Sequence, residues 1–274
     1  MLRIAHLTDP HVTAPQHRLC GLHTPTMLRR ALAAVAARPA GFYDAVVITG
    51  DLTDRGEPAA YEELARCLEG VAPPVYLIIG NHDDREAFRA VFADEPRYAA
   101  GDFVQYAIDD FSPHRLVFLD TNVPGIARGL LCDQRLAWLD EALAERPEAS
   151  TLVFLHHPPF ATRIPPLDAI GLDGVEGLAR VIARHPQVLS LHAGHVHRPM
   201  YGRLGRTPVT AVTSTCHQVA LDLVAPELVV TYEPPSFGLI LAERDDVLCH
   251  TVYFGEAEGP RLPYAPMRGR YDPA

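Results

Sequence analysis

The chain lacks any apolar run close to the ~18 residues that a membrane-spanning helix requires. Its N-terminal stretch, Met1–Asp9, also lacks the charged-then-apolar layout of a secretory signal, because the apolar part ends almost at once. Basic residues are the minority, with 24 Lys and Arg against 34 Asp and Glu. A basic footprint is what proteins need to hold DNA or RNA irrespective of sequence. We therefore expect a cytoplasmic protein with no membrane and no nucleic-acid partner.

Cysteine is scarce, and no two cysteines have the short spacing of a zinc knuckle or a redox motif. The five residues are Cys20, Cys67, Cys132, Cys216 and Cys249. They are typical of small core residues in a reducing compartment. Histidine, in contrast, is abundant, with 14 residues in a chain of 274, and its placement carries the information about function.

Short runs of branched apolar residues predict strands that are buried on both faces. These runs are Leu2–Leu7, Ala45–Ile48, Val75–Ile79, Leu116–Leu119, Leu152–Leu155 and Val188–Leu191. Stretches with helical periodicity lie between them, at Thr26–Arg38, Pro58–Gly70, Asp133–Arg146 and Gly174–His185. The alternation indicates an α/β protein with a mostly parallel sheet flanked by helices.

The pattern changes to strand-like runs from about Tyr201 onward, which predicts antiparallel hairpins. The runs are Val209–Thr213, Leu228–Tyr232, Phe237–Ala242 and Val247–Phe254. The simplest organisation is one domain over residues 1–254, with a motif-bearing core at 1–198 and a β-rich segment at 199–254. Residues 255–274 contain four prolines and are expected to form an extended arm or tail.

Five of the first six apolar runs are closely followed by residue types that can bind metal ions. The segments are Asp9-Pro10-His11, Gly50-Asp51, Gly80-Asn81-His82-Asp83, His156-His157-Pro158-Pro159 and Gly194-His195-Val196-His197. Ligands of open α/β sheets gather beyond the carboxyl ends of the strands, so side chains far apart in the sequence can meet there. Each motif alone is weak, but five in order are a strong signal.

The candidate ligands combine carboxylate, amide and imidazole groups. They are Asp9, His11, Asp51, Asn81, His156, His195 and His197. Such donors suit Mn, Fe, Co or Zn, and they are too many for one open tetrahedral site. A shared carboxylate would divide them between two divalent ions about 3.5–4 Å apart, an arrangement that hydrolyses phosphate esters.

This ordered set resembles the calcineurin-like binuclear metallophosphoesterases over residues 1–198. The Gly80–Asp83 tetrad, the His-His-Pro-Pro motif and Cys216-His217-Gln218 are similar to the bacterial branch of glycerophosphodiesterases and cyclic-nucleotide phosphodiesterases. The resemblance implies a four-layer α/β/β/α sandwich. It also implies that Asp9, His11 and His197 hold one metal, that Asn81, His156 and His195 hold the other, and that Asp51 bridges them.

The implied activity is hydrolysis of a small phosphodiester, such as cAMP or a glycerophosphodiester, by a hydroxide bridging the two metals. Asp51 and His82 would be catalytic, with His82 near the leaving oxygen as a proton donor or phosphate hydrogen-bond donor. Substrate contacts are expected from Asn81, His82, His217 and Arg55. Adjacency suggests that Asp83 orients His82.

Arg55 lies in the string Gly-Asp-x-x-Asp-Arg-Gly, which also occurs in serine/threonine protein phosphatases, where the arginine helps to hold phosphate. The alternative is a plain ion pair with Glu57 or Glu62.

Three other functions remain open. The protein could be a phosphomonoesterase or protein phosphatase that uses the same site, a non-catalytic scaffold, or a nuclease. We also expect a homo-oligomer built on a dimer, because the β-rich segment has exposed edges that need covering.

Overall fold

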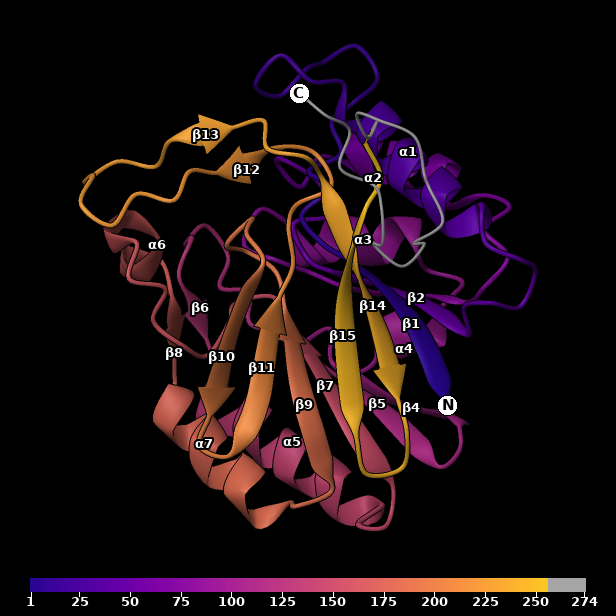
Figure 1. Ribbon diagram of the computed structural model, residues 1–274, viewed down its shortest axis with the longest axis vertical. Helices are drawn as coiled ribbons and strands as arrows, with labels where there is room; N and C mark the ends of the chain where they lie inside the picture. Colours follow the sequence, from indigo (N-terminus) through magenta and orange to yellow (C-terminus); the bar gives the residue numbers. More distant parts are fainter. Residues whose placement is uncertain (256–274) are drawn as a thin grey trace, which may run out of the picture.

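The computed structural model describes residues 1–255, and two β-sheets face each other at its centre (Figure 1). The first sheet has the order β15 (Val247–Tyr253), β14 (Ser236–Ala242), β1 (Leu2–Leu7), β2 (Ala45–Thr49) and β3 (Val75–Ile78). The second has the order β10 (Met200–Leu204), β11 (Thr207–Ala211), β9 (Val188–Ala193), β7 (Ser150–Leu155), β5 (His114–Leu119) and β4 (Tyr106–Phe111). The central strands of both sheets run parallel.

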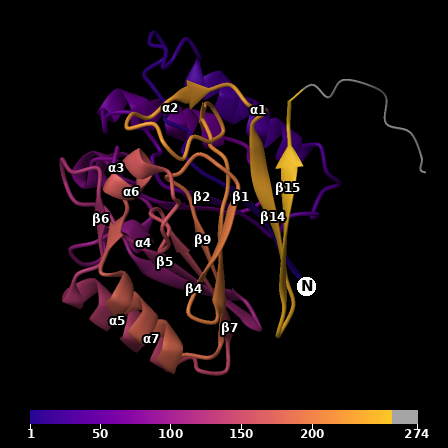
Figure 2. The same cartoon turned by 60° about the vertical axis from the view of Figure 1, so that its left-hand side comes forward.

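Helices cover the outer faces of the two sheets. Those that follow the strands of the first sheet are α1 (Thr24–Ala36), α2 (Pro58–Leu68), α3 (Arg85–Val91) and α4 (Pro96–Ala99). The second sheet is followed by α5 (Asp133–Glu145), α6 (Pro165–Ala169) and α7 (Val175–Arg184), and Figure 2 shows α5 and α7 lying along its outer side. The four-layer α/β/β/α sandwich is thereby confirmed.

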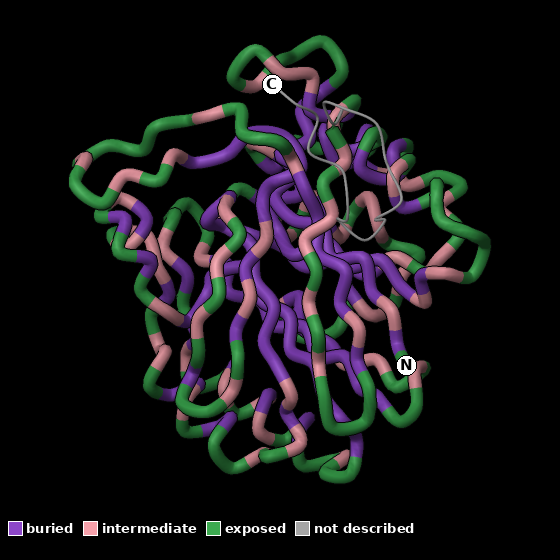
Figure 3. The backbone as a smooth tube through the Cα atoms, viewed as in Figure 1, coloured by how far each residue is buried: buried purple, intermediate pink, exposed green. Residues whose placement is uncertain are grey.

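The central strands β5 and β7 of the second sheet bury both of their faces. Phe118 and Phe154 stack at 5.2 Å between the two sheets, within the cluster that includes the first sheet. Their neighbours Val117 and Val153 point the other way, into the cluster formed with α5 and α7. Two apolar faces explain why these strands show no polar alternation in the sequence, and Figure 3 shows them as the buried interior of the molecule.

The β-rich segment extends both sheets. The hairpin β10–β11 widens the second sheet and β14–β15 widens the first, as antiparallel pairs. The expected antiparallel arrangement is wrong at one junction, because β11 pairs in parallel with β9. After β9, the connection 194–199 carries the chain past the neighbouring position in the sheet, so that β10 forms at the edge. The chain then returns as β11, which lies between β10 and β9.

A short hairpin of β12 (Gln218–Val219) and β13 (Val230–Thr231) lies beyond the carboxyl ends of the strands, and β6 (Gly129–Leu130) pairs with β8 (Leu172–Asp173). Of the tail expected at 255–274, all but Gly255 lies outside the described residues. Within residues 1–255, no helix has both the length and the apolar character to cross a membrane.

Candidate metal centre

The structure brings all seven candidate ligands together at the carboxyl edges of the two sheets. Each follows a strand in its own segment: Asp9 and His11 follow β1, Asp51 follows β2, Asn81 follows β3, His156 follows β7, and His195 and His197 follow β9. Three strands of one sheet and two of the other therefore contribute to one site.

The first group of ligand atoms surrounds Asp9. Its Oδ1 lies 3.3 Å from Nε2 of His197 and 4.0 Å from Nε2 of His11. The two imidazole nitrogens are only 3.1 Å apart. Asp9 Oδ1 is buried and has no hydrogen-bond partner among the described residues. A carboxylate oxygen without a donor, beside two converging imidazoles, fits a divalent cation.

The second group of ligand atoms surrounds His156. Nε2 of His156 lies 3.2 Å from Oδ1 of Asn81 and 3.3 Å from Oδ1 of Asp51. The other oxygen of Asp51, Oδ2, is 3.6 Å from Nε2 of His11 in the first group. The ring of His195 lies 5.1 Å from that of His156. Asp51 thus presents one oxygen to each group.

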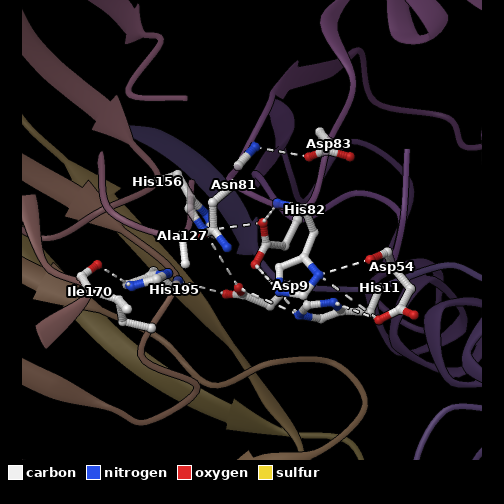
Figure 4. A network of polar contacts seen from close by, with 12 residues as sticks. Asp9, His11, Asp54, Asn81, His82, Asp83, Ala127, His156, Ile170 and His195 are labelled. Atoms are coloured by element: carbon white, nitrogen blue, oxygen red, sulfur yellow. Dashed lines mark hydrogen bonds and ion pairs between the residues drawn. The ribbon is translucent and has the colours of Figure 1, made fainter. Parts of the chain in front are cut away.

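Backbone carbonyls fix the tautomers of the imidazoles. His156 donates from Nδ1 to Thr49 O at 2.7 Å, and His197 donates from Nδ1 to His217 O at 2.9 Å. His195 donates from Nε2 to Ile170 O at 3.0 Å, as Figure 4 shows. In each ring the other nitrogen is the one left to bind a metal ion, and such outer partners typically orient metal ligands.

Electrostatics favour two ionised carboxylates in the site. Burial alone would raise the pKa of Asp9, but the adjacent His197 outweighs it and lowers the pKa to about 2. Burial would likewise raise the pKa of Asp51, but His156 holds it well below its usual range. In return, Asp51 overcomes the effect of burial on His156 and raises its pKa to about 9. The charge of Asp51 thus favours a proton on His156.

Other imidazoles of the site are held neutral. Burial and the neighbouring His156 lower the pKa of His195 to about 3. Burial and His197 lower the pKa of His217 to about 3, and burial also lowers the pKa of His11. A neutral imidazole is the form that binds a metal ion.

Backbone strain is concentrated at the same residues. Five candidate ligands have a positive φ: Asp9 (48°), His11 (42°), Asp51 (44°), His195 (69°) and His197 (51°). Asp and His are enriched among the non-glycine residues that adopt this conformation, which costs roughly 1–3 kcal/mol per residue. Close packing accompanies the strain, since a Cβ on Gly194 would overlap Oγ1 of Thr8.

His82 lies at the edge of the site, with its side chain 41% exposed. It donates from Nδ1 to Asp54 O at 2.8 Å, and its Nε2 lies 4.0 Å from Oδ2 of Asp51. The expectation that Asp83 orients His82 is wrong: Figure 4 shows Asp83 apart from it. Its carboxylate instead accepts hydrogen bonds from the backbone N–H groups of Leu52, Thr53 and Gly80.

The remaining predicted substrate contacts surround the two groups. Arg55 is 77% exposed, and among the described residues its ion pair is with Asp54, at 3.4 Å, rather than with Glu57 or Glu62. His217 is buried beside the first group, with its ring 4.6 Å from that of His197. A hollow of about 400 Å³ lined by Asn81, His82 and Arg55 opens next to the site.

Sequence reasoning missed two residues that contact the site. Oδ1 of Asp54 lies 3.6 Å from Nδ1 of His11, and the side chain of Asn122 contacts the backbone around Asn81. Asp54 belongs to the Gly-Asp-x-x-Asp string, and Asn122 follows the end of β5. Both are polar residues that follow the end of a strand, which is the signal that predicted the other site residues.

Comparison with known proteins decides the family. Residues 2–199 match the family described as calcineurin-like phosphoesterase. The chain belongs to this family. It is 38% identical to a probable cyclic nucleotide phosphodiesterase of Rhodopseudomonas palustris, covering 92% of this chain and 93% of the relative. It is 36% identical to a probable glycerophosphodiester phosphodiesterase of Arcobacter nitrofigilis, covering 79% and 80% of the two chains.

Two further comparisons agree with this membership. The chain is 32% identical to the 3',5'-cyclic adenosine monophosphate phosphodiesterase of Escherichia coli K12, covering 82% of each chain. A dimetal phosphatase from Danio rerio shares the fold with a TM-score of 0.68, at 15% identity and with 93% and 97% of the two chains covered. This member of the calcineurin-like phosphoesterases is a metal-dependent phosphoric diester hydrolase, and its site takes divalent metal ions.

Proposed function

We propose that the chain hydrolyses small phosphodiesters, either a cyclic nucleotide such as cAMP or a glycerophosphodiester, at a site for two metal ions. Asp9, His11 and His197 would hold one ion, and Asn81, His156 and His195 the other. The observation that carries this assignment is the position of Asp51, whose two oxygens face the two separate groups at 3.6 and 3.3 Å. A carboxylate so placed is suited to bridging two cations.

The donor set favours Mn, Fe, Co or Zn, because it mixes carboxylate, amide and imidazole without thiolate. When bound, such ions polarise the phosphate and lower the pKa of a water molecule. The protein contributes the arrangement: ionised Asp9 and Asp51, neutral His11 and His195, and rings fixed by backbone carbonyls.

His82 is proposed to act on the leaving group. Burial lowers its pKa, but Asp51 and Asp54 raise it above the ordinary value, so His82 keeps a proton more readily near neutral pH. Its Nδ1 is occupied by Asp54 O, which leaves Nε2 as the atom that can give a proton to the leaving oxygen. Neutral His217 is suited to binding substrate.

Arg55 and Asn81 are proposed as further contacts to the substrate. Both line the hollow beside the site, and Arg55 keeps most of its side chain exposed. A planar guanidinium can pair with two phosphate oxygens. The two substrate classes are supported by relatives named cyclic nucleotide and glycerophosphodiester phosphodiesterases. The string around Arg55 alone favours the alternative, a phosphomonoesterase or protein phosphatase.

A substrate comparison tests this function. With Mn²⁺ supplied, we expect faster hydrolysis of bis(p-nitrophenyl) phosphate than of p-nitrophenyl phosphate, and loss of both activities after chelation. A panel of cAMP and glycerophosphoethanolamine then separates the two classes. Turnover of the monoester alone, or full activity after exhaustive chelation, would contradict the proposal.

We also propose a homo-oligomer built on a dimer. The hairpin around β12 and β13 exposes apolar side chains, and Figure 3 shows most of this arm as exposed. The exposed apolar side chains of this hairpin are Leu221, Leu223, Val224, Leu228, Val229, Val230 and Tyr232. Exposed apolar side chains gathered on one hairpin favour a contact with another protein. We further propose that residues 1–254 form a single domain. We also propose a cytoplasmic location, which the free cysteines support.

A further inference from the structure

One strand end of the second sheet is adjacent to the site but supplies none of the candidate ligands. Strand β5 ends at Leu119, and Asp120, Thr121 and Asn122 follow it. All three side chains are buried, with Asn122 only 1% exposed. Buried polar groups at this edge of the sheet need partners. The side-chain NH₂ group of Asn122 finds its partners in the turn that carries Asn81.

The amide of Asn122 holds both ends of that turn. Its Nδ2 donates to Gly80 O at 2.6 Å and to Asp83 O at 3.1 Å. Gly80 is the residue before Asn81, and Asp83 is the residue after His82. One side chain therefore fixes the backbone on either side of a proposed metal ligand and a proposed proton donor.

Asn122 is itself rigidly held. Its backbone N–H donates to Oδ1 of Asp120 at 2.8 Å, and its backbone carbonyl accepts from Arg135 at 2.7 Å. Its side-chain Oδ1 accepts from Arg85 at 3.4 Å, and Arg85 also donates to Asp120. With its oxygen facing an arginine, the amide must direct its NH₂ group at the two carbonyls.

The contact joins the two sheets at the point where the second group of ligands spans them. Asn81 follows β3 of the first sheet, whereas His156 and Asn122 follow strands of the second. Oδ1 of Asn81 and Nε2 of His156 are 3.2 Å apart. A shift of the turn by a few tenths of an ångström would change this separation directly.

We infer that Asn122 is a positioning residue, which sets the place of Asn81 and His82 relative to the ligands of the second sheet. The inference rests on the proposed function, because the role of Asn81 as a ligand is itself proposed.

The substitution Asn122→Asp tests it. Aspartate has nearly the same shape, but it removes both N–H donors and places an oxygen against two carbonyl oxygens. We expect the affinity for the second Mn²⁺ ion to weaken by about 10- to 100-fold, with the first ion bound as in the wild type. Isothermal titration calorimetry measures both affinities, and the EPR signal of a coupled Mn²⁺ pair should be lost at two equivalents of metal.

A matched control is Gln105→Glu, which makes the same amide-to-acid change at another buried side chain. Gln105 lines a separate hollow with Gln134 and Trp138. Its variant should bind both ions like the wild type. A second check is the pair of variants Asn81→Ala and Asn81→Ala/Asn122→Asp: if Asn122 acts through Asn81, the double variant should bind the second ion no more weakly than the single one.

The outcomes separate this inference from the proposed function. A wild-type protein that binds fewer than two ions, or hydrolyses no phosphodiester, would refute the proposed function. A wild-type protein that does both, with an Asn122→Asp variant that binds the second ion equally tightly, would overturn the positioning role. If that variant does not fold, Asn122→Ser, which keeps one donor, is judged by the same criterion. Failure of both to unfold cooperatively would make Asn122 a purely structural residue and also overturn the inference.

Discussion

Replacing Asp83 by asparagine should destabilise the protein strongly, although the change is a single atom. The carboxylate receives five hydrogen bonds. Its Oδ2 accepts from the N–H groups of Leu52 at 2.9 Å and Gly80 at 2.8 Å. Its Oδ1 accepts from the N–H of Thr53 at 3.0 Å and the hydroxyls of Thr53 and Tyr61 at 3.2 and 2.9 Å. The three backbone neighbours are all donors, so only the two hydroxyls beside Oδ1 could accept from an amide NH₂ group.

The geometry bounds the cost of Asp83→Asn. With the NH₂ group in place of Oδ2, the N–H groups of Leu52 and Gly80 both lose their acceptor. In place of Oδ1, only the N–H of Thr53 does, because the two hydroxyls can rotate. A buried donor left without a partner costs about 1–3 kcal/mol, and the remaining bonds lose their charge assistance. We expect the free energy of unfolding to fall by about 2–4 kcal/mol, or roughly 5–15 °C in Tm.

Thermal and urea unfolding of the metal-free protein measure this effect, with Asp84→Asn as the control. Asp84 is exposed and caps α3 by accepting from Ala87 N at 2.8 Å, a role that asparagine fills equally well. The control should therefore unfold like the wild type. If the two variants unfold at the same temperature, or if Asp83→Asn is as stable as the wild type, the reasoning about five donors is refuted.

Two further predictions concern metal binding and assembly. Burial lowers the pKa of His156, but Asp51 raises it to about 9, so an ion that binds there below that pH must displace a proton. The affinity for Mn²⁺ should therefore rise about tenfold per pH unit between pH 6 and 8. Calorimetric affinities that do not change with pH would contradict this. Light scattering at micromolar concentration should give at least twice the monomer mass of 30.1 kDa, and Leu223→Asp on the exposed hairpin should lower it; a monomeric wild type would rule out the dimer.

The sequence predicts most of the strands because their apolar character comes from burial on two faces, a property that a run of residues records directly. The run Leu2–Leu7 coincides with β1. The apolar pattern does not predict strand β4, because Tyr106–Phe111 lies at the edge of the second sheet and carries Asp109 and Asp110 on its exposed part. Of the run at Leu228–Tyr232, only Val230 and Thr231 pair, since their partner strand is just as short.

The order of the strands in space is less accessible. Both the insertion of β11 beside β9 and the hairpin of β12 and β13 depend on where a connecting segment returns. The motifs predict that certain side chains gather at one edge of the sheets, but not which way each one points. Asp83 shows this limit: as the neighbour of His82 it suggested a partner for the imidazole, yet its carboxylate turns toward β2 and its loop. Only the path of the backbone distinguishes the two roles.

The same backbone path holds the ligands of the candidate site at one edge of the two sheets. The left-handed conformations of Asp9 and His11 after β1, and of His195 and His197 after β9, are unfavourable locally and persist because surrounding contacts impose them. The carbonyls that accept from the imidazoles are themselves fixed by the fold. The stability of the protein as a whole therefore supplies the strain energy of these four residues. Preorganised charge of this kind needs little rearrangement when charge develops on the phosphate, which is where electrostatic catalysis gains most.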